Sequence, residues 1–248
     1  MIDLHCHLLP GVDDGAPDMA AALALARAAV ANGITASVLT PHIYFGRWDN
    51  GLSSLRATFF AFREELAAQG IPLEVSLGGE VHLLPEAFDL LSADDLPFIG
   101  GWRDARVLLL ELPDGHVPVA AYQAVERFLA KNVIPMIAHP ERNKAVMRDP
   151  RVYDTFVRMG CLTQLTAASV CGMFGKNAHR TALQLLDSGA ATVIATDAHN
   201  LRARPPVLAE ARAAITERFG PQAGMVLTES NPAELLRGRA LLLDHQDP

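Results

Sequence analysis

Histidine and carboxylate side chains recur in this 248-residue sequence at a spacing that suits metal binding. His5 and His7 are two residues apart, and Asp197 and His199 repeat that spacing. Each pair closes a short apolar run of the kind that forms a β-strand, where residues two apart point to the same side. Imidazole and carboxylate groups are ligands that Zn²⁺, Mn²⁺ and Fe accept. Each pair can therefore supply two ligands to one metal centre.

Four more residues of these types stand at the ends of other apolar runs: His42, Glu80, Glu111 and His139. Taken alone, any one of them fits a hydrogen-bonded structural residue better than a ligand. Taken together they do not, because burying so many ionisable groups without partners costs on the order of several kcal/mol for each ion. A single catalytic metal usually takes about three protein ligands. A set of this size therefore indicates two or three ions that share a bridging carboxylate.

The elements that must position these residues alternate between short apolar runs and longer helical patterns. The apolar runs predict strands, several of them rich enough in Val, Ile and Leu to be buried on both faces. They are residues 2–6, 36–40, 73–79, 107–112, 134–138, 161–165 and 192–196. The helical patterns between them are residues 18–32, 52–69, 119–131, 150–159, 177–188 and 205–219.

Several ends of these elements carry their own signals. Gly33 and Gly70 follow the first two helical patterns, as helix-ending glycines do. Asn231 is expected to be the N-cap of a last short helix, because Pro232 suits the first helical position. Residues 45–50 and 93–104 are expected to be loops.

Repeated strand–helix units imply a parallel sheet. About seven such units, with no linker or low-complexity segment between them, favour a closed or nearly closed barrel formed by a single domain over residues 1–248. The carboxyl ends of the strands of such a barrel share one face, where active sites are built. Ligands that are far apart in the sequence should therefore converge there.

Composition excludes several other classes of protein. The formal net charge of −7 argues against a nucleic-acid partner held by broad phosphate contacts. No apolar stretch of about 18 residues is present, so no membrane insertion is expected. The N-terminus does not resemble a signal peptide, and we therefore expect a cytoplasmic protein. Three cysteines without a CxxC pair do not predict a disulfide framework, and Cys6 is expected to be a small buried hydrophobe.

The segment that contains the first two histidines resembles a known family. Residues 3–15, with the sequence DLHCHLLPGVDDG, are similar to the opening motif of the polymerase and histidinol phosphatase (PHP) superfamily. More narrowly, they resemble the bacterial metal-dependent protein-tyrosine phosphatases linked to capsule and exopolysaccharide synthesis. Further segments match that subgroup in order, namely residues 40–42 (TPH), 79–81 (GEV), 111–113 (ELP), 138–142 (AHPER) and 196–200 (TDAHN). The resemblance covers nearly the whole chain and implies a distorted (β/α)7 TIM-like barrel, the PHP fold.

The resemblance also implies a site with three metal ions. The first ion would be held by His5, His7, Glu80 and Asp197. Glu80 would bridge to a second ion, which is completed by Glu111 and His139. The third would be held by Asp14, His42 and His199. The residues alone leave Asp14 as a solvated carboxylate in a turn, so only the resemblance brings it into the site. We expect two or three divalent ions, manganese first, with iron, cobalt and zinc as alternatives.

The implied activity is hydrolysis of phosphotyrosine by a metal-bound hydroxide, on a bacterial tyrosine kinase that controls capsular or exopolysaccharide synthesis. Water bound to metal ions has a strongly lowered pKa. Arg142 and Arg204 match arginines that bind the substrate phosphate in the subgroup, and a guanidinium fork suits that task. The sequence has no Cys-x5-Arg loop of the kind that cysteine-dependent tyrosine phosphatases use.

Other interpretations are a small-molecule phosphatase such as histidinol phosphatase, an inactive metal-binding module, and a nuclease or proofreading domain. A complete ligand set opposes the second, and the acidic balance opposes the third. Two features stay open. The sixth strand ends near Gln164 without the more polar pattern of the family. The aromatic residues Tyr44, Phe45 and Trp48 either stack on a substrate phenol ring or pack under their own loop.

Overall fold

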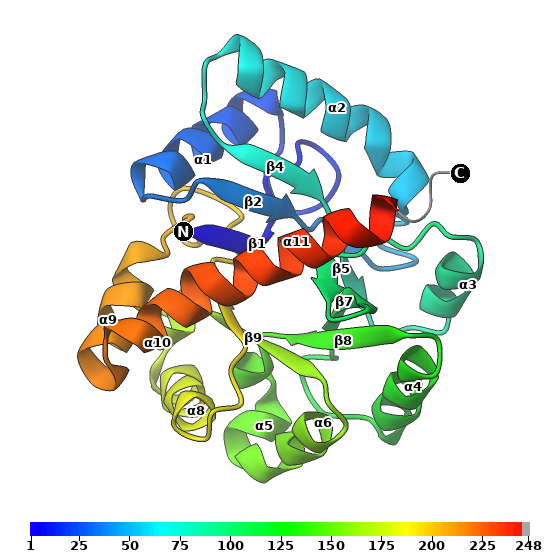
Figure 1. Ribbon diagram of the computed structural model, residues 1–248, viewed down its shortest axis with the longest axis vertical. Coiled ribbons are helices and arrows are strands. Elements are labelled where there is room, and N and C mark those ends of the chain that lie inside the picture. Colours follow the sequence, from blue (N-terminus) through cyan, green and yellow to red (C-terminus); the bar gives the residue numbers. More distant parts are fainter. Residues whose placement is uncertain (245–248) are drawn as a thin grey trace.

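Parallel strands form the centre of the molecule, and helices cover its outside (Figure 1). The computed structural model describes residues 1–244, and side chains as far as Gly238. One parallel sheet contains β1 (Ile2–Cys6), β2 (Ala36–Leu39) and β4 (Glu74–Leu77), in that order. The second sheet has the order β10 (Val193–Ala195), β9 (Leu162–Thr166), β8 (Val133–Ala138), β7 (Ala105–Glu111), β5 (Glu80–His82) and β3 (His42–Ile43).

The two sheets join into a nearly closed barrel. At one junction β1 lies beside the chain that follows β10: Asp197 N donates to His5 O at 2.7 Å, and His7 N donates to Ala198 O at 2.8 Å. At the other junction the chain continues from β2 into β3 and from β4 into β5, and Glu80 N donates to Pro41 O at 3.1 Å, so that the first sheet continues into the second. The expected parallel α/β barrel is confirmed, and the seven predicted strands are all present.

After each of the second and third predicted strands, the structure has a further short strand that the sequence did not predict. β2 ends at Leu39 and the chain restarts as β3 at His42, after Pro41, which has no N–H to donate to a ladder. β4 ends at Leu77 and β5 starts at Glu80. The two glycines between them allow close packing: a Cβ on Gly78 would lie 2.7 Å from Val38 Cγ1, and one on Gly79 would lie 2.6 Å from Ile43 Cδ1.

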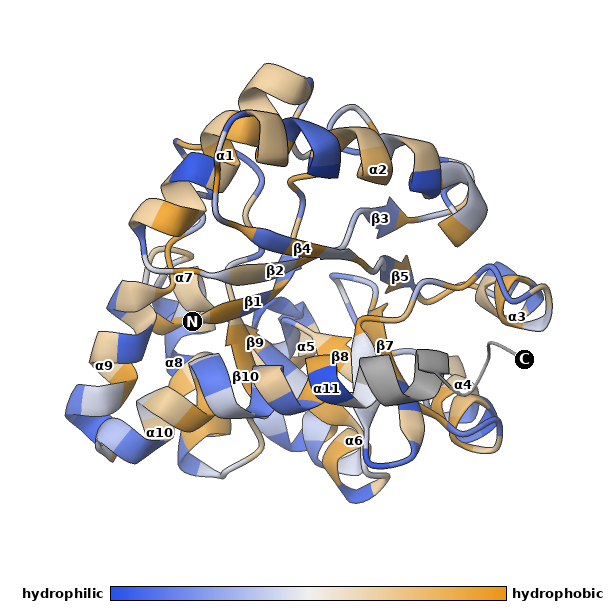
Figure 2. Cartoon of the chain, turned by 45° about the horizontal axis from the view of Figure 1, so that its top comes forward, coloured by the Kyte–Doolittle hydropathy of each residue, from blue (hydrophilic) through white to orange (hydrophobic). Residues whose placement is uncertain are grey.

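Side chains alternate along the strands between the barrel interior and the helical layer. On β7, Val107 and Leu109 join the smaller buried cluster with Leu4 and Met136, whereas Leu108 and Leu110 belong to the larger cluster. Figure 2 shows the strands as mainly hydrophobic segments at the centre, and helices with both hydrophilic and hydrophobic residues around them. Because the alternation has a period of two, Glu111 follows Leu109 on the same side.

The larger helices follow the predicted order, and all but the last, α9, start within about one residue of the predicted position. They are α1 (Met19–Ala31), α2 (Leu52–Ala68), α4 (Val119–Leu129), α8 (Lys176–Asp187) and α9 (Ala209–Phe219). Gly33 and Gly70 have φ values of +86° and +61° just past α1 and α2, as expected for residues that end helices. The shorter helices are α3 (Glu86–Ser92), α5 (Lys144–Arg148), α6 (Asp154–Arg158), α7 (Ala167–Val170) and α10 (Pro221–Met225).

Three predictions about the outer elements were wrong. The segment 93–104, expected to be a loop, contains β6 (Gly100–Trp102), which pairs antiparallel with β7. The helix expected over residues 205–219 begins only at Ala209. Asn231 is not an N-cap. Its φ of −64° and ψ of −45° are helical, and the chain before it is already helical from Pro221 onward. Its side chain instead donates to Thr192 O at 2.8 Å, and α11 (Asn231–Asp244) continues from it.

The helix α11 crosses the strands in Figure 1 and packs on β6. A Cβ on Gly100 would lie 2.7 Å from Leu235 O, and one on Gly238 would lie 2.3 Å from Gly101 O. Glycines on both elements therefore allow this close approach. Among the described residues, no helix is long and apolar enough to cross a membrane.

Candidate metal centre

Four buried side chains from opposite ends of the chain form the centre of the site. His5 Nε2 lies 3.2 Å from His7 Nε2 and 3.3 Å from both Glu80 Oε2 and Asp197 Oδ1. His7 Nε2 lies 3.4 Å from the same two oxygens. Ligand atoms that surround an ion tetrahedrally at about 2.0–2.1 Å lie roughly 3.3–3.4 Å apart. The spacing of this group therefore fits a metal ion.

Glu80 lies between this group and a second set of side chains. Its Oε1 is 2.7 Å from His139 Nε2, and its Oε2 is 3.0 Å from His42 Nδ1. Glu111 completes the set, with Oε1 at 3.9 Å from His139 Nε2 and Oε2 at 3.9 Å from His42 Nδ1. The two oxygens of Glu80 thus face different histidines, as a carboxylate must if it is to bridge two ions.

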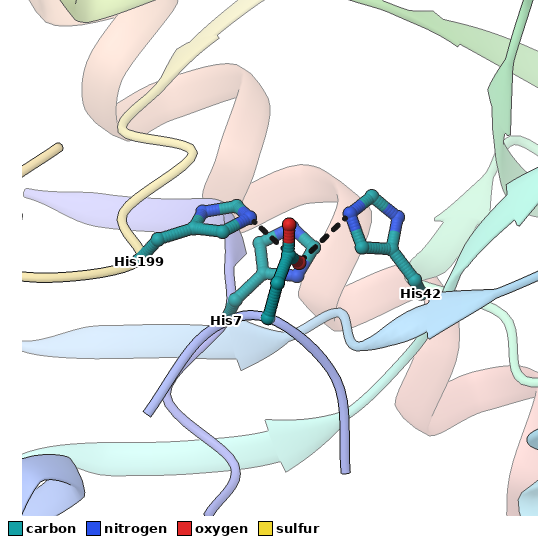
Figure 3. Close-up of side chains that lie close together, drawn as sticks. His7, His42 and His199 are labelled. Carbon is teal, nitrogen blue, oxygen red and sulfur yellow. Dashed lines mark ion pairs between the residues drawn. The ribbon is translucent and has the colours of Figure 1, made fainter. Parts of the chain in front are cut away.

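A third group faces the solvent. Asp14 Oδ1 lies 3.3 Å from His42 Nε2 and 3.4 Å from His199 Nε2. Figure 3 shows His7, His42 and His199 with their rings turned toward one point, and dashed lines mark the ion pairs made by His42 and His199. The Asp14 side chain is 43% exposed, whereas His199 is 2% exposed. This side of the site is therefore open to an incoming ligand.

Several buried polar atoms in these groups lack the hydrogen bonds that buried groups normally make. Within the described residues, four atoms of the three groups lie at ion-pair distance from a neighbour but make no hydrogen bond: His42 Nδ1, Glu80 Oε2, Asp197 Oδ1 and His199 Nε2. An unsatisfied buried polar atom costs about 1–3 kcal/mol, and such atoms are uncommon in folded proteins. All four belong to the residue groups with metal-ligand spacing. A bound cation would satisfy them, so the donor set fits divalent metal ions.

The charges of the site also favour a cation. Burial would lower the pKa of His42, but Glu80 and Asp14 outweigh it and raise that pKa to about 10. Burial would raise the pKa of Asp197, yet the charge of His5, a hydrogen bond from His7 and the charge of Arg204 hold it well below its usual value. These carboxylates are therefore ionised, and they attract either a proton or a metal ion to the histidines beside them.

Two arginines lie at the edge of the cluster. Arg142 Nη1 and Arg204 Nη2 both donate to Asp197 Oδ2, while Oδ1 of the same carboxylate faces His5 and His7. Their side chains are 30% and 22% exposed. The structure therefore brings both predicted arginines to the cluster.

Two residues to which the sequence had assigned no role, Asp13 and Gln164, hold the histidines in place. Asp13 Oδ2 lies 2.7 Å from His7 Nδ1 and accepts from His42 N at 2.9 Å. Gln164 Oε1 lies 2.9 Å from His5 Nδ1 and accepts from His139 N at 3.2 Å. An acceptor at Nδ1 keeps the proton there and leaves Nε2 free as a ligand. The only sequence signal for Asp13 is its place beside Asp14. The contribution of the sixth strand, left open by the sequence, is Gln164, which contacts His5 and His139.

Backbone conformation sets the direction of two of these side chains. His139 and Asp197 have φ values of +32° and +53°, in the left-handed region that residues other than glycine rarely adopt. Such strain persists where the surrounding structure enforces it and is concentrated at functional sites. His139 directly follows β8, and Asp197 lies two residues past the end of β10.

Two of the three aromatic residues after β3, Tyr44 and Trp48, pack on the site, whereas Phe45 packs against the larger buried cluster. The Trp48 ring is stacked on His42, with centroids 4.8 Å apart and an interplanar angle of 9°. The Tyr44 ring is stacked on His82 at 4.1 Å, and His82 Nδ1 lies 3.1 Å from Glu111 Oε2. The rings of Tyr44 and Trp48 therefore contact histidines of the site, which neither sequence interpretation had proposed.

Cys6 stands between His5 and His7 in the sequence but is unsuited to this chemistry. Cys6 is fully buried, with its Sγ 3.5 Å from Val38 O, as expected for a small hydrophobe. Burial raises the pKa of its thiol well above the usual value, so Cys6 is protonated at neutral pH and unsuited to nucleophilic attack.

Comparisons with known proteins agree with this geometry. Residues 1–237 match the family described as "Capsular polysaccharide synthesis, CpsB/CapC". Tyrosine-protein phosphatase YwqE of Bacillus subtilis is 35% identical over 100% of this chain and 96% of its own length. The putative tyrosine-protein phosphatase CapC of Staphylococcus aureus is 31% identical over 84% of this chain and 80% of its own length.

A solved structure gives the same result. It comes from crystal structures of YwqE from Bacillus subtilis and CpsB from Streptococcus pneumoniae, described as metal-dependent tyrosine phosphatases. It superposes with a TM-score of 0.89 and 35% sequence identity, over 96% of this chain and 95% of that chain. The likeness extends over the whole barrel that carries the candidate metal centre.

Proposed function

This chain belongs to the CpsB/CapC family of capsular polysaccharide synthesis proteins, and we propose that its metal centre hydrolyses phosphotyrosine on a protein substrate of that system. The chain is a metal-dependent tyrosine-protein phosphatase of the capsule-synthesis type. One observation carries the proposal. Three groups of His and carboxylate residues have metal-ligand spacing, and Asp197, a member of one of them, also accepts hydrogen bonds from two arginines.

The ligands divide into three sets in this proposal. The first ion would be held by His5, His7, Glu80 and Asp197, the second by Glu80, Glu111 and His139, and the third by Asp14, His42 and His199. Two or three divalent ions would occupy these sets, with manganese first and iron, cobalt or zinc as alternatives. Geometry supports the first set most directly, since its ligand atoms have the spacing of a tetrahedral site.

Metal ions held by these residues would lower the pKa of water and neutralise charge on the phosphoryl oxygens. Arg142 and Arg204 donate hydrogen bonds to the other phosphoryl oxygens, because each guanidinium presents several donors in a fixed plane. Asp197 holds both guanidinium groups at the edge of the cluster before substrate binds. Phosphoryl transfer depends mainly on such positioning and on electrostatics. Water is consumed, and tyrosine and inorganic phosphate are released.

We further propose that the phosphotyrosine belongs to a bacterial tyrosine kinase that controls capsular or exopolysaccharide synthesis. The family description places the chain in capsule synthesis, and the solvent-exposed Asp14 side of the site leaves room for a protein substrate.

The substrate assignment is tested with a panel of phosphomonoesters. Metal-free protein is reconstituted with Mn²⁺ and assayed against a phosphotyrosine peptide, the matching phosphoserine peptide and histidinol phosphate. We expect the phosphotyrosine peptide to have the highest kcat/KM. Preference for histidinol phosphate would instead make the chain a small-molecule phosphatase.

The ligand assignment is tested by three substitutions. His5→Ala, Glu80→Ala and Asp197→Ala should each remove most of the turnover and lower the metal content measured by elemental analysis. Phe60→Ala on the outer face of α2 is the control, because Phe60 is exposed and lies outside the metal-ligand groups. Full metal loading with near wild-type turnover in any of the three variants would remove that residue from the ligand set.

A further inference from the structure

An apolar cavity of about 260 Å³ adjoins the two arginines. One wall comes from Cys171, Met173 and Phe174, after β9 and α7, and the other from Arg204 and Val207, after β10. Both segments follow strands at their carboxyl ends, so the cavity lies on the face of the barrel that carries the metal centre. Thr196, which directly precedes Asp197, also lines it.

The arginines connect this cavity to the candidate metal centre. Arg204 lines the cavity and donates to Asp197 Oδ2. Arg142 donates to the same oxygen, and its Cζ lies 5.0 Å from the centroid of the Phe174 ring. Phe174 therefore touches one arginine and shares the cavity wall with the other. A phosphate held between the guanidinium groups would leave its ester substituent next to Phe174.

We propose that this cavity binds the phenol ring of phosphotyrosine, with Phe174 as its aromatic wall. The inference rests on the proposed function and names the part of the site that recognises tyrosine. A cavity of roughly 150 Å³ is enough for a benzene ring, so the volume here admits a phenol ring with part of the neighbouring peptide. A phosphoserine side chain is too short to fill it, and the cavity would then favour tyrosine.

The alternative position for the ring, beside Tyr44 and Trp48, is already engaged. Trp48 is stacked on His42, and the Arg47 guanidinium lies 3.9 Å from the centroid of the indole ring. Tyr44 is stacked on His82. A phenol ring would have to displace these contacts, whereas Met173 is 58% exposed and Phe174 offers its ring to an open cavity.

The charge in the cavity suits a neutral ring better than a second anion. Glu210 lines it, and its Oε2 accepts from Asn32 Nδ2 at 3.2 Å. This carboxylate opposes a phosphate inside the cavity and leaves the arginine edge as the place for the phosphate. The ring then points inward and the anion outward, toward the metal ligands.

Cys171 provides a direct reporter, because it lines the cavity and is exposed, while Cys6 and Cys161 are buried. The Mn²⁺-reconstituted full chain is treated with iodoacetamide, and alkylation of Cys171 is followed by peptide mass spectrometry. At about ten times its Kd, phenylphosphonate should slow the reaction roughly tenfold by occupying the cavity. Methylphosphonate and inorganic phosphate should leave the rate near that of the free protein. Equal rates with phenylphosphonate and methylphosphonate would overturn the proposal.

A substitution at the aromatic wall tests the same point through binding. Phe174→Ala should weaken competitive inhibition by phenylphosphonate about tenfold, the scale of an aromatic contact, and should leave methylphosphonate inhibition and metal content near wild type. Phe174→Leu should recover part of the loss, and Phe60→Ala should change neither inhibitor. An equal loss for both phosphonates would show that Phe174 positions Arg142 rather than binding a ring. If phosphotyrosine peptides are not hydrolysed by the wild type at all, the proposed function fails instead.

Discussion

At the scale of single residues, Asp197 joins the candidate metal centre to the two arginines at its edge. One of its oxygens faces His5 and His7, and the other accepts from two arginines. Its left-handed backbone conformation, with φ of +53°, sets this orientation. The carboxylate thus contributes to both parts of the site, and its effects can be separated from those of the arginines.

Removing either arginine should impair catalysis without removing the metals. Guanidinium has no lone pair with which to bind a metal ion, so Arg142→Ala and Arg204→Ala should keep metal content close to wild type. Each should lose on the order of 10²-fold in kcat/KM, comparable to losing a preorganised charge-stabilising donor. Lysine at either position should restore only part of the lost kcat/KM, because an ammonium group cannot bind phosphate through two donors in one plane. Kinetics and metal analysis on the four variants would decide, and full activity in both alanine variants would contradict the assignment.

The carboxylate behind His7 should control metal affinity. Asp13 accepts at His7 Nδ1, so Asp13→Asn removes the charge that favours the ligand tautomer while keeping a similar shape. Second partners of metal-bound histidines typically change affinity by about 10–100-fold. We expect a loss in that range in competition with a chelator, with Asp18→Asn, at the N-cap of α1, as the control. Unchanged metal affinity would mean that Asp13 only stabilises its own turn, where it accepts from Gly15 N.

The sequence could predict most of the candidate ligand residues, with Asp14 added only by the family resemblance, but not the residues that orient them. The histidines and carboxylates stand out because charged groups at the ends of apolar strands are unusual. Asp13 and Gln164 carry no such signal: an Asp in an Asp-Asp-Gly turn and a Gln at a strand end are each common. Their roles depend on contacts such as His5 to Gln164, which join residues far apart in the chain.

At the scale of elements, the barrel could be predicted well because its strands are locally apolar and its helices end at glycines. The additional short strands β3 and β5 could not be predicted, because the points where β2 and β4 end depend on packing between segments. A Cβ on Gly79 would lie 2.7 Å from Pro97 Cγ, and nothing near Gly79 in the sequence reveals that contact. The same holds for Asn231, whose N-cap signal is overridden by the helical chain before it.

The segment after β3 should stabilise the third ligand group. Trp48 covers the ring of His42, which faces Asp14 through one nitrogen and Glu80 through the other. Trp48→Ala should free this imidazole and weaken metal binding at the third group about tenfold, the scale of a lost aromatic contact. Trp48→Phe should retain most of the affinity. Metal stoichiometry at graded chelator concentrations measures this, and identical titrations for both variants would show that the stacking is incidental.

At the scale of the whole molecule, the candidate metal centre lies where the barrel closes. The ligands run from His5 to His199 in the sequence, and the backbone bonds that join β1 to the chain after β10 involve His5, His7 and Asp197. A bound ion would therefore connect the first strand of the barrel to its last. The same region concentrates negative charge in a protein whose net charge is already −7.

Removing the metals should therefore destabilise the entire fold. Ligands that bind only the folded state add about 2.7 kcal/mol at 100 times their Kd, and for a chain of this size about 1 kcal/mol corresponds to roughly 2–4 °C in Tm. We expect chelation to lower Tm by roughly 5–10 °C, and Mn²⁺ to restore it. The difference should shrink as the pH falls from about 7 to 6, because protons compete with metal ions for the histidine ligands. Differential scanning calorimetry at both pH values measures this, with Glu80→Ala as the control whose response to chelation should be smaller. A Tm that does not respond to chelator, in protein shown to have lost its metal, would mean that the barrel closes without help from the site.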